Sequence, residues 1–114
     1  MNYHKVFAQI KEQYPQLEPA VLKFARLPHN WFGAFDHNTL EISLAKVHGN
    51  RSTGFYIIVL LHECYHYLQK VNNKPLCEKE ADEWALSQCY QFPNLIDESD
   101  MDAYTEHRKW IYNY

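Results

Sequence analysis

The chain has 114 residues, 46% of them hydrophobic, and a formal net charge of −3 at pH 7. This length suits one domain with one core, residues 1–114, and the composition excludes a disordered chain. The 11 basic residues form no run or stripe, so nucleic acid is not an expected partner.

Two further features bear on location. The longest apolar run, residues 55–61, is far shorter than the roughly 20 residues that span a bilayer, and the N-terminal residues lack an apolar signal core. Cys64, Cys77 and Cys89 are odd in number and lack a disulfide-framework spacing, which favours reduced thiols. We expect a cytoplasmic protein without a membrane partner; the sequence does not indicate an oligomeric state.

The first half of the chain predicts two helices and then two strands. Apolar residues three to four apart predict an amphipathic helix over about residues 3–14, ended by Pro15, and a second short helix within residues 16–28. In "NWFGAFDHNTLEISLAKV" apolar and polar residues alternate on both sides of a polar "DHN" break. This pattern predicts a β-hairpin.

The second half predicts helices only. A long helix is expected over about residues 54–71, with Ser52 or Thr53 as its N-cap, followed by helices over residues 77–91 and, capped by Ser99, 99–112. The predicted fold class is therefore α+β: a small antiparallel sheet packed on helices, with the helix over residues 54–71 in the centre.

That central helix contains the motif His62-Glu63-x-x-His66. Residues four apart lie on the same face of a helix, so the two imidazoles can share one Zn²⁺ ion. Glu63 is turned by about 100° from His62, where it can reach a metal-held water as a general base. Composition alone would produce such a motif in roughly three of a hundred chains, so it needs further support.

A second pair of residues, Glu78 and Asp82, gives that support. They are again four apart and share a helix face, whereas Glu80 points away from them and is only a reserve candidate. Glu78 is the candidate third ligand, and Asp82 can accept the free N–H of a ligating histidine. Only 11 residues separate His66 from Glu78, which requires a tight turn around residues 72–74.

The motif His62-Glu63-x-x-His66 followed by Glu78-x-x-Ala81-Asp82-x-x-Ala85 resembles the gluzincin clan of zinc metallopeptidases. The order of elements is similar to that of ImmA/IrrE-type peptidases and minigluzincins. The resemblance implies a zincin-like domain with His62, His66 and Glu78 as zinc ligands and Glu63 as base. It also implies a protein or peptide substrate, laid in extended form against an edge strand such as "TLEIS".

Such clans often add a His or Tyr that stabilises the oxyanion, and Tyr104, His107 and Tyr112 on the last predicted helix are candidates. For each of the three, packing or surface exposure is the simpler explanation. Cys64 and Tyr65, the two free positions of the motif, should face the core.

Three functions are compatible with these patterns. The first is a zinc-dependent peptidase. The second is a latent or inactive zincin-like protein that acts by docking a protein partner, with "RKWIYNY" at the C-terminus as a plug for its cleft. The third is a metal-free helical interaction domain.

Overall fold

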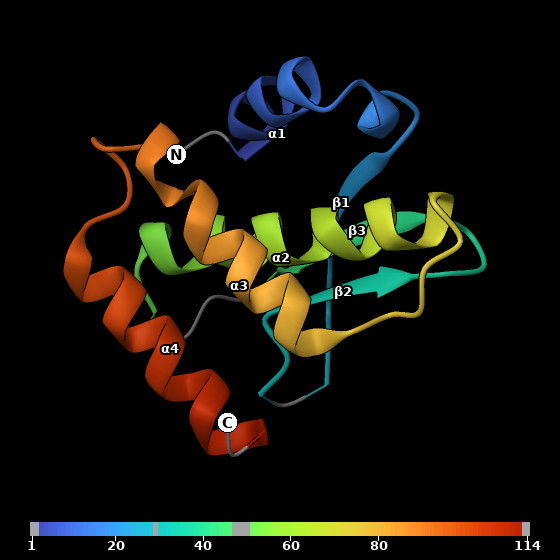
Figure 1. The fold of residues 1–114 in the computed structure, drawn as a ribbon. Helices are drawn as coiled ribbons and strands as arrows, with labels where there is room; N and C mark the ends of the chain where they lie inside the picture. The colour runs from blue at the N-terminus through green and yellow to red at the C-terminus, as the bar shows by residue number, and fades with distance from the viewer. Residues whose placement is uncertain (1–2, 29, 47–50, 113–114) are drawn as a thin grey trace.

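A computed structural model describes residues 3–28, 30–46 and 51–112 of the chain. Its elements follow in the order α1 (Tyr3–Gln13), β1 (Val21–Ala25), β2 (Gly33–Asp36), β3 (Glu41–Ala45), α2 (Thr53–Val71), α3 (Glu78–Gln88) and α4 (Glu98–Tyr112), with short 3₁₀ turns at Pro15–Leu17 and Cys89–Gln91 (Figure 1). The predicted α+β class is confirmed. In the described ranges no helix is both long and apolar enough to cross a membrane.

The sheet has the strand order β1-β3-β2, so β3 is central and β1 and β2 are the edges. Strands β2 and β3 form the predicted antiparallel hairpin, with Phe35 opposite Ile42. The sheet is nevertheless mixed rather than wholly antiparallel, because β1 pairs with β3 in parallel.

Strand β1 replaces the short helix that was expected within residues 16–28; that prediction was wrong. Val21, Leu22 and Phe24 fit a helical stripe only loosely, and the same residues suit a pleated strand, in which Leu22 is buried and Val21 is exposed. Pairing with the open side of β3 satisfies the backbone groups of β1 that face β3, from Val21 to Ala25. This tertiary pairing outweighs a weak local helix signal.

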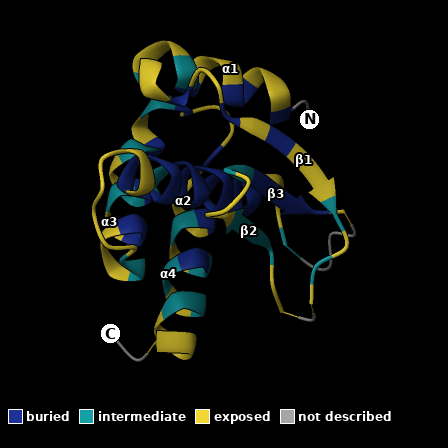
Figure 2. Cartoon of the chain, turned by 90° about the vertical axis from the view of Figure 1, so that its right-hand side faces the viewer, coloured by how far each residue is buried: buried dark blue, intermediate teal, exposed yellow. Residues whose placement is uncertain are grey.

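Helix α2 is the centre of the molecule, as predicted. Fifteen of its 19 residues are buried, and Figure 2 shows it enclosed by the sheet and the other helices. A helix buried on every side needs no polar stripe, which explains why the strand-like run around Ile57 and Ile58 is helical here. Ser52 is the N-cap, since its hydroxyl accepts the N–H of Phe55 at 3.1 Å.

Helix α4 begins one residue earlier than predicted, and its cap is Asp97 rather than Ser99. The Asp97 carboxylate accepts the N–H of Asp100 at 2.9 Å, and the Asp100 carboxylate accepts the N–H of Asp97 at 2.9 Å. This reciprocal pair is a capping box. The Ser99 hydroxyl instead donates to Asp97 at 2.7 Å.

Candidate metal centre

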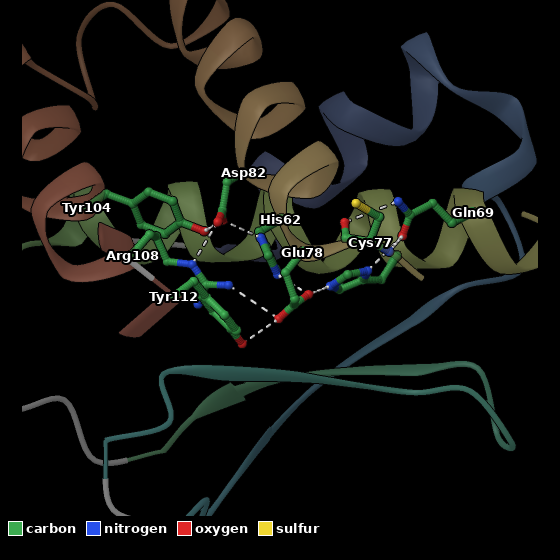
Figure 3. A network of polar contacts seen from close by, with 9 residues as sticks. His62, Gln69, Cys77, Glu78, Asp82, Tyr104, Arg108 and Tyr112 are labelled. Carbon is green, nitrogen blue, oxygen red and sulfur yellow. Dashed lines mark hydrogen bonds and ion pairs between the residues drawn. The ribbon is translucent and has the colours of Figure 1, made fainter. Parts of the chain in front are cut away.

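The two histidines of the motif lie one above the other on α2. Their ring centroids are 4.5 Å apart, with the planes at 89°, and His62 and His66 are only 3% and 6% exposed. The Nε2 atom of His62 lies 3.3 Å from Oε2 of Glu78, and Nε2 of His66 contacts the same oxygen. Three potential ligand atoms from two helices therefore meet at one point (Figure 3).

Glu78 reaches this point because α3 begins directly after a tight turn. Asn73 adopts a left-handed conformation with φ of 58°, which asparagine tolerates better than most residues, and its N–H donates to Lys70 O at 3.1 Å. Glu78 is the first residue of α3. The 11-residue spacing thus accommodates Glu78 at the site, while Glu80 is exposed to solvent.

Each imidazole has a side-chain oxygen close to its Nδ1 atom, on the side away from Glu78. Nδ1 of His62 lies 2.7 Å from Oδ1 of Asp82, an ion-pair contact with the carboxylate that was predicted to orient a ligating histidine. Nδ1 of His66 lies 2.8 Å from Oε1 of Gln69, a residue that the sequence reasoning missed. Gln69 is three residues after His66, and that helical spacing is the signal that could have identified it. Oxygen atoms at Nδ1 leave both Nε2 atoms available for a metal.

Three side chains of helix α4 donate hydrogen bonds to the carboxylates of Glu78 and Asp82. Arg108 donates from Nε to Asp82 at 2.9 Å and from Nη2 to Glu78 at 3.2 Å. The Tyr112 hydroxyl donates to Oε1 of Glu78 at 3.0 Å, and the Tyr104 hydroxyl donates to Asp82 at 2.7 Å. Glu78 therefore turns one oxygen to the histidines and the other to α4. No motif or spacing in the sequence distinguishes Arg108 as part of the site.

The charges at the site are tightly coupled. Burial opposes protonation of His62, but its hydrogen bonds with Asp82 and Glu78 raise its pKa to about 9. Burial works to raise the pKa of Glu78, yet the adjacent His62 and His66 hold that pKa well below its usual range. Because a metal ligand must be deprotonated, a cation that binds here would displace the proton from His62.

Glu63 lies beside the histidines without joining the Glu78 contact. One ligand atom each from His62, Glu63 and His66 lie within 4.8 Å of one another, and Glu63 is 7% exposed. Burial raises the pKa of Glu63, against the opposing effect of His62 and His66. A carboxylate with a raised pKa next to ligand atoms is suited to accept and return a proton.

The other two positions of the motif serve packing. Cys64 is fully buried in the core, and burial raises the pKa of its thiol, so the prediction that it faces the core is confirmed. Tyr65 is half-buried and stacks on Trp84 of α3, with ring centroids 5.2 Å apart. This contact fixes α3 against α2 close to the site.

A cleft of about 430 Å³ opens beside these groups. Its walls come from β2 and the residues before it, from α2, from the start of α3 and from α4; they include Trp31, Phe32, Gly33, Phe35, Val59, Leu76, His107, Ile111 and Tyr112. The strand that borders the cleft is β2. The expected edge strand "TLEIS" is β3, which is central and paired on both sides, so that prediction was wrong.

Strand β2 can present backbone groups along the cleft. Ala45 N donates to Phe32 O at 2.9 Å, which makes Phe32 and Ala45 a hydrogen-bonded pair of the antiparallel ladder. Because such pairs alternate, the N–H and C=O groups of Gly33 and Phe35 point away from β3. An extended chain could add to this edge.

Gly33 brings β2 close to the face of α2 that carries Val59 and Glu63, and a side chain at position 33 is expected to lower the stability of the protein. A Cβ atom at position 33 would lie 2.5 Å from Cγ1 of Val59 and 3.3 Å from Cγ of Glu63. Gly33→Ala is expected to reduce the free energy of unfolding by about 1–3 kcal/mol, as overpacking usually does. Urea denaturation will measure the loss. In a Val59→Ala background the same change should cost less, and an equal cost in both backgrounds would contradict this account.

The three candidate oxyanion donors differ in their surroundings. Tyr104 is buried at the wall of the cleft, and its hydroxyl donates to Asp82 at 2.7 Å. His107 lines the cleft with its ring 5.0 Å from that of Phe32, and burial, with help from nearby Arg51 and Arg108, lowers its pKa. Tyr112, at the cleft, donates to Glu78.

We found no match to this chain among models of protein families, curated protein sequences or solved structures.

Proposed function

We propose that this protein is a zinc-dependent peptidase that hydrolyses peptide bonds of a protein or peptide substrate. The observation that carries the proposal is the convergence of His62 Nε2, His66 Nε2 and Glu78 Oε2 at the wall of a cleft. The resemblance of the two motifs to gluzincins, including ImmA/IrrE-type peptidases and minigluzincins, supports the same reading. The free state of Cys64, Cys77 and Cys89 is consistent with action in the cytoplasm.

The donor set suits zinc in a catalytic rather than a structural site. Two imidazole nitrogens and one carboxylate oxygen are a common ligand set of catalytic zinc, whereas structural sites are closed by four protein ligands. An oxygen atom lies within 2.8 Å of Nδ1 of each imidazole, Oδ1 of Asp82 for His62 and Oε1 of Gln69 for His66, which leaves Nε2 as the atom available to a metal. Three ligands leave a coordination position toward the cleft.

The residues around the proposed zinc site would each have a separate role in peptide hydrolysis. Zinc, when bound, would polarise the scissile carbonyl and lower the pKa of a coordinated water. Glu63 would take a proton from the attacking water and pass it to the leaving amine. Gly33 and Phe35 of β2 would align an extended substrate through backbone hydrogen bonds. Tyr104, His107 and Tyr112 all line the cleft and are the candidates to donate to the developing oxyanion.

The decisive experiment measures zinc content and peptide cleavage together. Wild type and Glu63→Gln are purified in parallel, their zinc is quantified by mass spectrometry, and both are incubated with a peptide mixture. We expect roughly one zinc ion per chain in both proteins. Only the wild type should cleave efficiently, with the rate of Glu63→Gln lower by about 10²- to 10⁴-fold, the usual contribution of a general base.

Folded wild type that retains no zinc would refute the proposal. Cleavage at equal rates by both proteins would exclude Glu63 as the base and point to a contaminating peptidase.

A catalytically latent or inactive zincin-like protein is the second candidate. The observation in its favour is that Arg108 and Tyr112 of α4 both donate to Glu78 and line the cleft. In this case the zinc-loaded full chain would be inert, and a chain that ends at residue 109 would cleave peptides. Inactivity of both forms would favour a protein that acts by docking a partner.

A further inference from the structure

Gln69 is a buried polar residue that takes no part in the proposed ligand set. It lies in the last turn of α2, one turn beyond His66, and its side chain is 1% exposed. Its Oε1 atom lies 2.8 Å from Nδ1 of His66. The same amide makes a two-point contact with the backbone of Cys77, the residue that precedes Glu78 (Figure 3).

The backbone of Cys77 determines which way the Gln69 amide points. The Cys77 N–H can only donate, and it lies 3.3 Å from Oε1 of Gln69; the Cys77 carbonyl can only accept, and it lies 3.3 Å from Nε2. The reversed amide would place donor against donor and acceptor against acceptor. Oε1 is therefore the atom that faces His66, and it must accept the proton on Nδ1.

The same contact satisfies one backbone donor at the start of α3, the N–H of Cys77. Cys77 is the N-cap residue of α3, and its side chain makes no capping hydrogen bond. Gln69 thus joins the end of α2 to the start of α3 across the 11-residue connection between the proposed ligands. It orients His66 directly, and it fixes Glu78 through the adjacent peptide group.

We propose that Gln69 is a positioning residue that couples the two proposed ligands His66 and Glu78: the Cys77 peptide fixes its amide, and the amide keeps Nδ1 of His66 protonated so that Nε2 faces the metal. This inference rests on the proposed metal site and does not require that the site be catalytic.

The test compares Gln69→Leu and Gln69→Glu with wild type. Leucine has a similar size and removes both contacts, whereas glutamate can still accept from His66 and from the Cys77 N–H but cannot donate to the Cys77 carbonyl. Ile10→Val, a buried α1 residue that does not line the cleft, controls for a general loss of stability. Zinc affinity is measured by competition with a chromophoric chelator, and the His66 tautomer by ¹⁵N NMR of the zinc-loaded protein.

We expect Gln69→Leu to weaken zinc binding by about 10- to 100-fold, the usual effect of losing an outer-shell partner. The ¹⁵N spectrum of its His66 ring should no longer show the proton solely on Nδ1, as it does in the wild type. Gln69→Glu should keep that pattern and bind zinc with intermediate affinity, and Ile10→Val should match the wild type in both measurements.

Wild-type affinity together with a wild-type ring pattern in Gln69→Leu would overturn the inference while leaving the metal site standing. If Gln69→Leu does not fold, Gln69→Glu decides: a lost Nδ1–H pattern would overturn the inference, and a retained pattern with weaker binding would support it. A wild type that binds no zinc would remove the proposed function and this inference together. Zinc binding without peptidase activity would leave the inference intact.

Discussion

Replacement of Glu78 by alanine is expected to lower the zinc affinity of the protein by more than about 100-fold, because losing even an outer-shell partner costs about 10- to 100-fold. Oε2 of Glu78 contacts both histidines, so the variant keeps only the two imidazoles of the three proposed zinc ligands. It also leaves Asp82 as the one carboxylate among the described residues that accepts from the Arg108 guanidinium. The measurement is competition for zinc against a chelator of known affinity.

Glu80→Ala is the matched control for this variant. Glu80 has the same side chain, lies two residues further along α3 and is exposed, and the sequence left it as a reserve ligand. Its replacement is expected to leave zinc affinity unchanged. Equal affinities of the two variants would show that Glu78 is not a ligand, and a loss confined to Glu80→Ala would reverse the assignment.

Gly54→Ala is expected to lower the free energy of unfolding by about 1–3 kcal/mol, the usual cost of overpacking. Helix propensity alone predicts the opposite sign, a gain of up to about 1 kcal/mol, because Gly54 lies in the first turn of α2. A Cβ atom at position 54 would lie 2.5 Å from Cγ of Asp100 and 2.9 Å from the backbone oxygen of Leu95, so both neighbours would have to move. The midpoint and slope of urea denaturation will measure the change.

The cause can be isolated in a double-mutant cycle with Asp100→Ala. Asp100 accepts the Ser52 hydroxyl and the Asp97 N–H, which hold its carboxylate against Gly54. Without that carboxylate, Gly54→Ala should cost less, and the difference is the coupling between the two positions. An increase in stability in the wild-type background would refute the packing argument.

The candidate site was largely readable from the sequence because its parts are spaced locally. His62 and His66 share a helix face through a spacing of four residues, and so do Glu78 and Asp82. Two such pairs on consecutive helices needed only a short connection to meet. Helical geometry therefore anticipated that these four side chains lie together; that Asp82 contacts His62 rather than His66 is known only from the structure.

What the sequence did not predict depends on tertiary packing. Strand β1 pairs with the free side of β3, and this pairing makes β3 the central strand. The local sequence pattern predicts neither the strand β1 nor the central position of β3. Arg108 reaches Asp82 and Glu78 from a helix more than 25 residues away in sequence, and nothing in its surroundings distinguishes it from other arginines. Helical spacing could have predicted the contact of Gln69 with His66, but not its contact with Cys77.

The burial of α2 has a consequence for how the centre can respond to an incoming molecule. His62, His66 and Glu63 belong to the element whose amide hydrogens should exchange last with solvent, since stability within a protein follows burial and contact density. The two imidazoles and the Glu63 carboxylate are thus held on the most rigid element of the protein. Induced fit is therefore expected from the opposite walls: β2, which is an edge strand, and the C-terminal end of α4, where Ile111 and Tyr112 are exposed.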